Sequence, residues 1–156
     1  MAAPAAAPAP GQPGSHSATP IRLHGSSVAI AGRAALITGR AGAGKSALSL
    51  QLLALGAALV ADDITCLWRA GDAIIADAPD TIRGRIEARG IGILNAAAQG
   101  PAPLALWVDL DSTETERLPP LRNRPCLGLD LPLLHNPETG CFPAAIMQYL
   151  RHGRHA

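Results

Sequence analysis

The stretch "LITGRAGAGKSALSL", residues 36–50, constrains the fold more than any other part of this chain. It contains Gly39, four further residues and then Gly44-Lys45-Ser46, with an apolar run before it and an Ala- and Leu-rich run after it. This spacing is typical of a loop that joins a strand to a helix and cradles the phosphates of a nucleotide. The sequence therefore predicts an α/β domain with a phosphate-binding loop.

The residue types in the loop fit phosphate chemistry. Its glycines permit positive φ and a close approach of backbone N–H groups to phosphate oxygens. The helix that follows points its N-terminal dipole at the same anion. The predicted nucleotide-binding residues are Gly39, Arg40, Ala41, Gly42, Ala43, Gly44, Lys45 and Ser46. Lys45 is expected at the β- and γ-phosphates and Ser46 at Mg²⁺.

Lys45 is also the only lysine among 13 basic residues. The chain uses arginine almost everywhere, and a planar guanidinium does not replace a compact ammonium at this position. The alternative to a phosphate loop is a Gly-rich turn without a ligand. The strand before the loop and the helix after it favour the phosphate loop.

Composition excludes several classes of protein. A formal net charge of +1 gives no electrostatic footprint for nucleic acid. No apolar run approaches the ~20 residues of a membrane span. The length of 156 residues suits one domain. We predict a disordered Ala- and Pro-rich tail over 1–19, which does not resemble a signal peptide, and a catalytic domain over 20–152.

The three cysteines are widely spaced, with neither metal-site spacing nor an even number for disulfides. We expect reduced, buried thiols in a cytoplasmic protein.

Local patterns predict the secondary structure. Short strands are expected at 21–24, 27–30 and 34–38, with turns at Gly25 and Gly32, followed by a helix over 46–55 and a buried strand over 57–63. The remaining predictions are a hairpin of strands 65–69 and 72–78, a loop over 81–94, strands 104–110 and 126–134, and a helix over 143–153. Together these elements form a mixed sheet with flanking helices.

Two strands end in acids. Asp62 and Asp63 close the strand after the predicted helix, which should bring them to the phosphate-loop edge of the sheet. One could face the γ-phosphate or its metal while the other supports a neighbouring loop; a solvated strand end is the alternative. Asp109 and Asp111 form a rival pair, because periodicity alone does not separate the two runs. A metal carboxylate at Asp109 would favour a generic NTPase.

Two further residues have open interpretations. Glu87 lies between Arg85 and Arg89 in an acid-poor, Gly-punctuated segment. It is either a second metal ligand or part of an exposed ion-pair loop. His24 on its own is typical of an ordinary core or surface histidine.

The runs "GRAGAGKS", "LVADD" and "IEARGIGI", in this order, resemble the catalytic domain of HPr kinase/phosphorylase. The resemblance covers about residues 20–150. It implies the fold type shared with phosphoenolpyruvate carboxykinase. It also implies ATP- and Mg²⁺-dependent phosphorylation of a seryl residue of the phosphocarrier HPr, in regulation of carbohydrate metabolism and the phosphotransferase system. The reverse reaction in this family is phosphorolysis.

Carried over by motif, the resemblance implies specific roles. His24 is similar to the family's active-site histidine, and Lys45 to its ATP-binding lysine. Asp63 is similar to the proton acceptor of the forward reaction and the proton donor of the reverse one. Ser46 and Glu87 correspond to Mg²⁺ ligands. Arg117 in "TERLP" resembles an active-site arginine.

The chain also departs from the family. A Pro-Gly-Arg-Asn loop usual near the C-terminus is replaced by "PLLHNPETGCF", and only a tail precedes the domain. These features resemble short single-domain proteobacterial members, so we expect weak or absent phosphorolysis. A homo-oligomer is possible. The alternatives are a non-catalytic ATP-sensing module and a generic NTPase.

Overall fold

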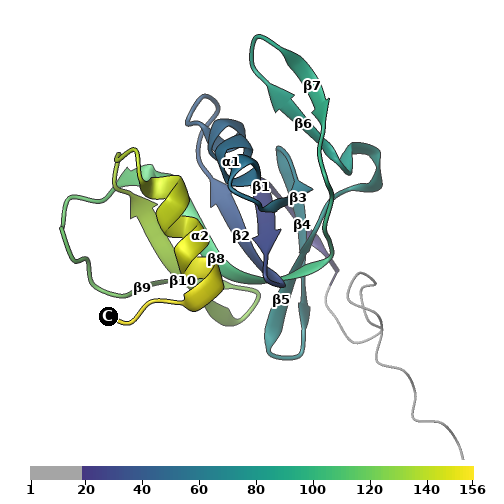
Figure 1. Ribbon diagram of the computed structural model, residues 1–156. Helices are drawn as coiled ribbons and strands as arrows, with labels where there is room; N and C mark the ends of the chain where they lie inside the picture. Colours follow the sequence, from purple (N-terminus) through teal and green to yellow (C-terminus); the bar gives the residue numbers. More distant parts are fainter. Residues whose placement is uncertain (1–18) are drawn as a thin grey trace, which may run out of the picture.

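The computed structural model describes residues 19–156, so nearly all of the predicted tail lies outside the described residues. The strands and helices form a mixed α/β sheet fold, as predicted (Figure 1). In chain order they are β1 (Ile21–Ile30), β2 (Arg33–Thr38), α1 (Lys45–Ala54), β3 (Ala58–Ala61), β4 (Ile64–Ala70), β5 (Ala73–Asp77), the short 3₁₀ helix η1 (Asp80–Ile82), β6 (Arg85–Ala88), β7 (Gly92–Asn95), β8 (Ala102–Thr113), β9 (Arg122–Cys126), β10 (Leu129–Asn136) and α2 (Phe142–His152).

The main sheet places its central strands under the helices. β2 pairs in parallel with β8, and β8 in parallel with β10, whereas β1 runs antiparallel to β2 and β3. The two helices lie side by side on one face of this sheet (Figure 1). β2 and β3 both run antiparallel to β1, so they point in the same direction. The C-terminal end of β2, which leads into the loop, and the C-terminal end of β3, which leads into Asp62 and Asp63, therefore lie at the same end of the sheet.

A second part of the fold is made of strands alone. The pairings β1–β4, β4–β5, β5–β8, β8–β2 and β2–β1 form a closed circuit. β2 is buried on both faces: Ala35 and Ile37 pack under the helices, and Ala34 and Leu36 pack inside the circuit. Alternating residues of one apolar strand therefore supply two cores.

Several predicted boundaries were wrong. β1 is one continuous strand, and Gly25 lies inside it. A Cβ at Gly25 would stand 3.0 Å from the carbonyl oxygen of Ile37, so glycine allows a close strand approach there rather than a turn. Gly32, with φ of +73°, does lie in the turn before β2, as predicted.

The predicted loop 81–94 was also wrong, because β6 and β7 pair as a hairpin. Both glycines have positive φ: Gly90 lies in the turn of this hairpin, and Gly92 begins β7 opposite Ala88. The predicted strand 126–134 is two strands, since Leu127 and Gly128 both have positive φ and reverse the chain. The helices, the hairpin of β4 and β5, and the strand within β8 agree with prediction, apart from their ends.

The cysteines agree with the prediction only in part. All three are free, but Cys141 is exposed and Cys66 is half-buried; Cys126 is buried. Burial raises the pKa of the Cys66 and Cys126 thiols. None of the helices in the described part of the chain is long and apolar enough to cross a bilayer.

Candidate active site

The loop between β2 and α1 is held at both ends. The Arg40 amide donates to both carboxylate oxygens of Asp111, each at 3.0 Å, which fixes the start of the loop against β8. Gly42 and Gly44 have φ of +83° and +102°, and open space surrounds the position of a Cβ at each. These two amides have no backbone acceptor among the hydrogen bonds of residues 19–156. The loop therefore offers free donors at the start of a helix.

Lys45 lies over its own loop. Its Nζ donates to the carbonyl oxygens of Gly39 at 2.7 Å and Arg40 at 3.1 Å. Both acceptors are neutral, so the ammonium carries a charge that no carboxylate in the described chain neutralises within ion-pair distance. An anion bound on the loop would be its natural counter-charge.

Asp62 joins the loop to two other elements. Ser46 Oγ donates to its Oδ1 at 2.6 Å, and Ser26 Oγ on β1 donates to the same oxygen at 2.9 Å. The backbone amide of Glu87 on β6 donates to Oδ2 at 2.9 Å. Asp62 is only 7% exposed, and these three donors satisfy its buried carboxylate.

Asp63 differs from Asp62 in exposure, in hydrogen bonding and in backbone conformation. It is exposed, and its carboxylate makes no hydrogen bond or ion pair among the described residues. Its backbone has φ of +67°, and the Ile64 amide bonds back to the Asp62 carbonyl at 2.7 Å, closing a tight turn. A three-residue turn closed in this way, with positive φ at its central residue, is a rare and strained conformation that costs about 1–3 kcal/mol. Strain of that kind is often found where a side chain must be held for function.

His24 lies beside this turn. It is exposed on β1 and is the register partner of Ile64, while the next amide, of Gly25, donates to the Asp63 carbonyl at 2.8 Å. Thr65 Oγ1 reinforces the junction by donating to the Gly25 carbonyl at 2.9 Å. The structure therefore brings His24, Ser46, Asp63 and the backbone of Glu87 around Asp62.

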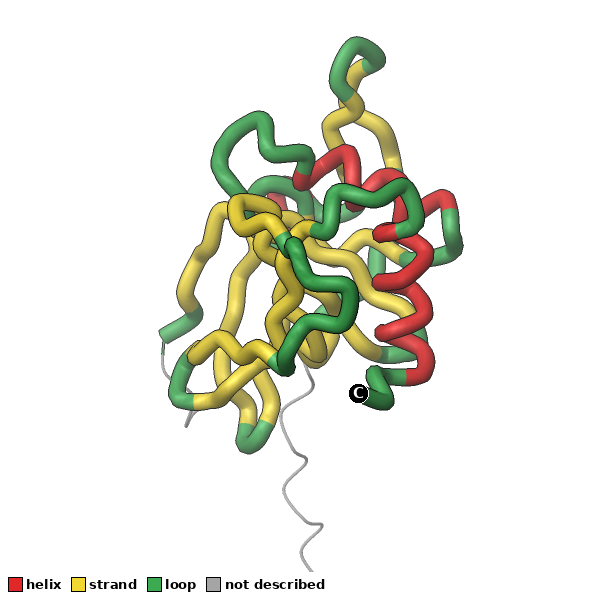
Figure 2. The backbone as a smooth tube through the Cα atoms, turned by 90° about the vertical axis from the view of Figure 1, so that its left-hand side faces the viewer, coloured by secondary structure: helices red, strands yellow, loops and turns green. Residues whose placement is uncertain are grey.

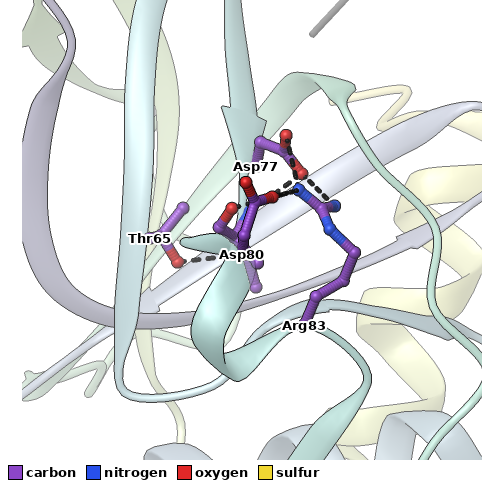
Figure 3. Close-up of polar contacts among 6 residues, drawn as sticks. Thr65, Asp77, Asp80 and Arg83 are labelled. Carbon is purple, nitrogen blue, oxygen red and sulfur yellow. Dashed lines mark hydrogen bonds and ion pairs between the residues drawn. The ribbon is translucent and has the colours of Figure 1, made fainter.

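The loop leading to the β6–β7 hairpin is held by an ion pair (Figure 3). Arg83 donates to the two carboxylate oxygens of Asp77 at 2.6 and 3.0 Å, and to Asp80 at 3.2 Å. The bond to Asp77 raises the pKa of the guanidinium above its ordinary value. Gly100 lies against this pair, because a Cβ there would stand 2.8 Å from Asp77 Oδ1.

In the described part of the chain, no hydrogen bond or ion pair joins Arg117 or Asp109 to this group. Arg117 is exposed in the connection between β8 and β9 and makes no hydrogen bond or ion pair among the described residues. Asp109 accepts from the Asp111 amide and from Ser112, and lies 3.7 Å from Arg124. The rival acid pair therefore has structural partners rather than Ser46.

Sequence reasoning missed two contributors. Ser26 was not singled out, although it bonds to Asp62 and accepts from the Asp63 amide at 3.2 Å. The Arg83–Asp77 pair was also missed. A buried serine two residues after His24 carries no recognisable pattern, and the ion pair depends on tertiary contact.

Comparisons with known proteins identify the family of this chain. The family described as HPr Serine kinase C-terminal domain matches residues 15–100, which include the loop, Asp62, Asp63 and the hairpin but not Arg117. The chain is 38% identical over 113 residues to an HPr kinase/phosphorylase of Alkaliphilus metalliredigens, covering 70% of this chain and 37% of that protein. It is 42% identical over 84 residues to one of Leptothrix cholodnii, covering 53% and 26%.

The chain thus spans about a third of the length of these curated relatives. Among solved structures, it is similar to the HPr(Ser) kinase/phosphatase from Coxiella burnetii, with a TM-score of 0.71 and 28% identity. That similarity covers 84% of this chain and 94% of the other, so the fold continues beyond the family match. The chain belongs to the HPr serine kinase C-terminal domain family.

Proposed function

We propose that this chain is an ATP-dependent protein-serine kinase of the cytoplasm that phosphorylates the phosphocarrier HPr and so regulates carbohydrate metabolism. The observation that carries the proposal is the pair of hydrogen bonds that the Asp62 carboxylate accepts, one from the Ser46 hydroxyl and one from the Glu87 amide. It joins the three sequence runs of the family resemblance in one site. Relatives named HPr kinase/phosphorylase support the choice of HPr, and three free cysteines fit a reducing compartment.

The loop supplies the nucleotide site. Free amides at Gly42 and Gly44, together with the first turn of α1, would bind phosphate oxygens of ATP. Lys45 would exchange its two carbonyl partners for a charge-assisted bond to phosphate. Asp111 would hold the loop in shape while this happens.

Ser46 and Glu87 would hold Mg²⁺. Both offer oxygen ligands, and the Glu87 carboxylate has no partner among the contacts of residues 19–156, so the donor set fits the ion. No three His, Cys, Asp or Glu side chains gather as a metal site in that part of the chain. Mg²⁺ in nucleotide sites commonly takes one or two protein ligands and the phosphates. When bound, it neutralises charge on the transferring phosphoryl group.

Asp63 would act as the general base. Its carboxylate accepts the proton of the substrate serine as the serine oxygen bonds to the γ-phosphorus, the bond to the bridging oxygen breaks, and ADP leaves. Asp62 is poorly suited to this role because its two oxygens already accept three bonds. His24, on the adjacent strand, would orient the Asp63 turn, and Arg117 would supply charge in the transition state.

We also propose that phosphorolysis is weak. Arg122 and Arg124 are candidates to replace the cation of the missing C-terminal loop, but both are already paired. Arg122 bonds to Glu114 at 3.2 Å, and Arg124 lies 3.7 Å from Asp109 and 4.5 Å from the centre of the Trp107 ring. Releasing either to clamp phosphate would cost those contacts.

The test is the fate of the γ-phosphate of labelled ATP, with and without purified HPr. We expect label on an HPr serine. Free phosphate without transfer would favour a generic NTPase, and retained ATP would favour a sensing module. Adding inorganic phosphate to phosphoseryl-HPr and measuring pyrophosphate tests the reverse reaction.

A further inference from the structure

The β6–β7 hairpin has one covered and one exposed face. Register pairs Glu87 with Ile93 and Arg85 with Asn95, so these four side chains share a face. Ile86 and Ala88 point the opposite way and are buried, with 1% and 5% exposure. The exposed face therefore contains the candidate metal ligand and, directly across from it, an isoleucine.

Two large apolar side chains on this hairpin are left in solvent. Ile91 at the turn is 75% exposed and Ile93 is 66% exposed, and neither belongs to either core. Figures 1 and 2 both show the hairpin extending beyond the rest of the domain. Neighbouring exposed apolar side chains beside a site are typical of a surface that another protein covers.

The hairpin is firmly tied to the site. The Glu87 amide is bonded to Asp62, and the Arg83–Asp77 ion pair holds the segment that enters β6. A phosphate chain gains nothing from an isoleucine, so phosphate binding on the loop does not explain Ile93. A serine on a folded protein, in contrast, brings its surrounding surface against whatever borders Asp63 and Glu87.

We propose that the hairpin face, defined as Arg85, Glu87, Ile91 and Ile93, docks the protein that carries the acceptor serine. This inference rests on the proposed kinase function and names where its protein substrate binds. Arg85 and Arg89 are exposed and make no ion pair among the described residues. The matching surface of the partner is therefore an apolar patch bordered by carboxylates.

The test is a steady-state comparison of the wild-type chain with Ile91→Thr/Ile93→Thr. Threonine keeps the β-branch that favours strands while removing apolar contact. We expect KM for purified HPr to rise about tenfold, the change that ~1.4 kcal/mol of lost contact produces. The value of kcat and the affinity for ATP should stay unchanged. Leu55→Thr is the matched control, because Leu55 is 46% exposed at the end of α1 away from the loop.

Binding of HPr should also be measured by calorimetry, since it reports docking without transfer. Weaker binding in the double variant supports the docking face even if no phosphate is transferred. A lack of transfer would count against the kinase function and not against the docking face. Equal KM and equal binding in the two proteins would overturn the docking face. It would also be overturned if the double variant only dissociated an oligomer of this chain, which would assign the face to self-association.

Discussion

Two pairs of acids lie beside the phosphate loop, one directly after β3 and one in the last part of β8, and the two pairs have different partners. After β3, Asp62 bonds to Ser46 and to the hairpin, while the Asp63 carboxylate has no partner in residues 19–156 and its backbone φ is positive. At the end of β8, Asp111 holds the first amide of the loop and Asp109 holds its own strand end and Arg124. One acid of each pair therefore contacts the phosphate-loop segment, Asp62 through Ser46 and Asp111 through the Arg40 amide.

The difference shows how equal sequence patterns acquire unequal roles. The β8 acids both have partners that fix the backbone, so they behave as structural groups. In the β3 pair, one acid takes the structural role and leaves the other unoccupied. Asp63 is the better candidate for the chemical step. Its carboxylate has no hydrogen bond or ion pair among the described residues, and it lies in a strained turn.

Substitution of Lys45 tests whether the loop binds the nucleotide. We expect Lys45→Ala to weaken ATP binding about 10- to 100-fold, because one charge-assisted contact contributes ~1.5–3 kcal/mol. Thermal stability should hardly change, since the hydrogen bonds of the Lys45 ammonium within the described residues go to two carbonyls of its own loop. Titration with a fluorescent ATP analogue measures the affinity. Unaltered affinity would show that the loop does not bind the nucleotide.

Asp62→Asn should reveal the structural member of the β3 pair. The buried amide would present its NH₂ to donors that now bond to a carboxylate oxygen. We expect the free energy of unfolding to fall by about 1–3 kcal/mol. Urea denaturation measures it, with exposed Asp72→Asn as the control. If Asp62→Asn were as stable as the control, Asp62 would not be the joint between loop and hairpin.

Asp111→Ala should have a smaller effect at the β8 end. The substitution removes both acceptors of the Arg40 amide, a loss comparable to that of a helix cap, about 1 kcal/mol. ATP affinity should fall less than in Lys45→Ala. The same denaturation and titration experiments apply, and a larger loss of affinity than in Lys45→Ala would move Asp111 into the binding site.

The smallest expected effect is on thermal stability at low pH. The bond from Arg122 lowers the pKa of Glu114, just after β8. The stability this pair provides is present above the ordinary carboxyl pKa of about 4.3 and is lost as pH falls through the lower folded value. We therefore expect Glu114→Gln to flatten the fall of Tm below pH 4.3. Parallel Tm curves for the two proteins would exclude a contribution from this pair.

Much of the site could be predicted because its signals are local. The loop spacing, the helix after it and the acids after the next strand are all readable within residues 36–63. The hairpin over Arg85–Asn95 was missed although Arg85, Ile86, Glu87 and Ala88 alternate with period two. The glycines were interpreted as a pliable loop, whereas their positive φ closes a turn.

Other features depend on contacts between distant segments. Gly25 lies inside a strand because the chain there approaches β2 closely. Asp62 can be buried because Ser26, 36 residues away, donates a hydrogen bond to its carboxylate. Propensity does not report such neighbours. The predicted role of Arg117 in the active site rests on the family resemblance alone. No hydrogen bond or ion pair in the described chain joins Arg117 to the loop.

The most direct measurement is phosphate transfer from labelled ATP to HPr by Asp63→Asn and Asp109→Asn side by side. Asparagine tolerates positive φ, so Asp63→Asn should fold normally, and it removes the base. We expect a loss of about 10²-fold or more for Asp63→Asn, the scale of general-base removal, with ATP binding retained. Asp109→Asn should keep most of its transfer activity. Full activity in Asp63→Asn with loss in Asp109→Asn would contradict the assignment and place the chemistry at the end of β8.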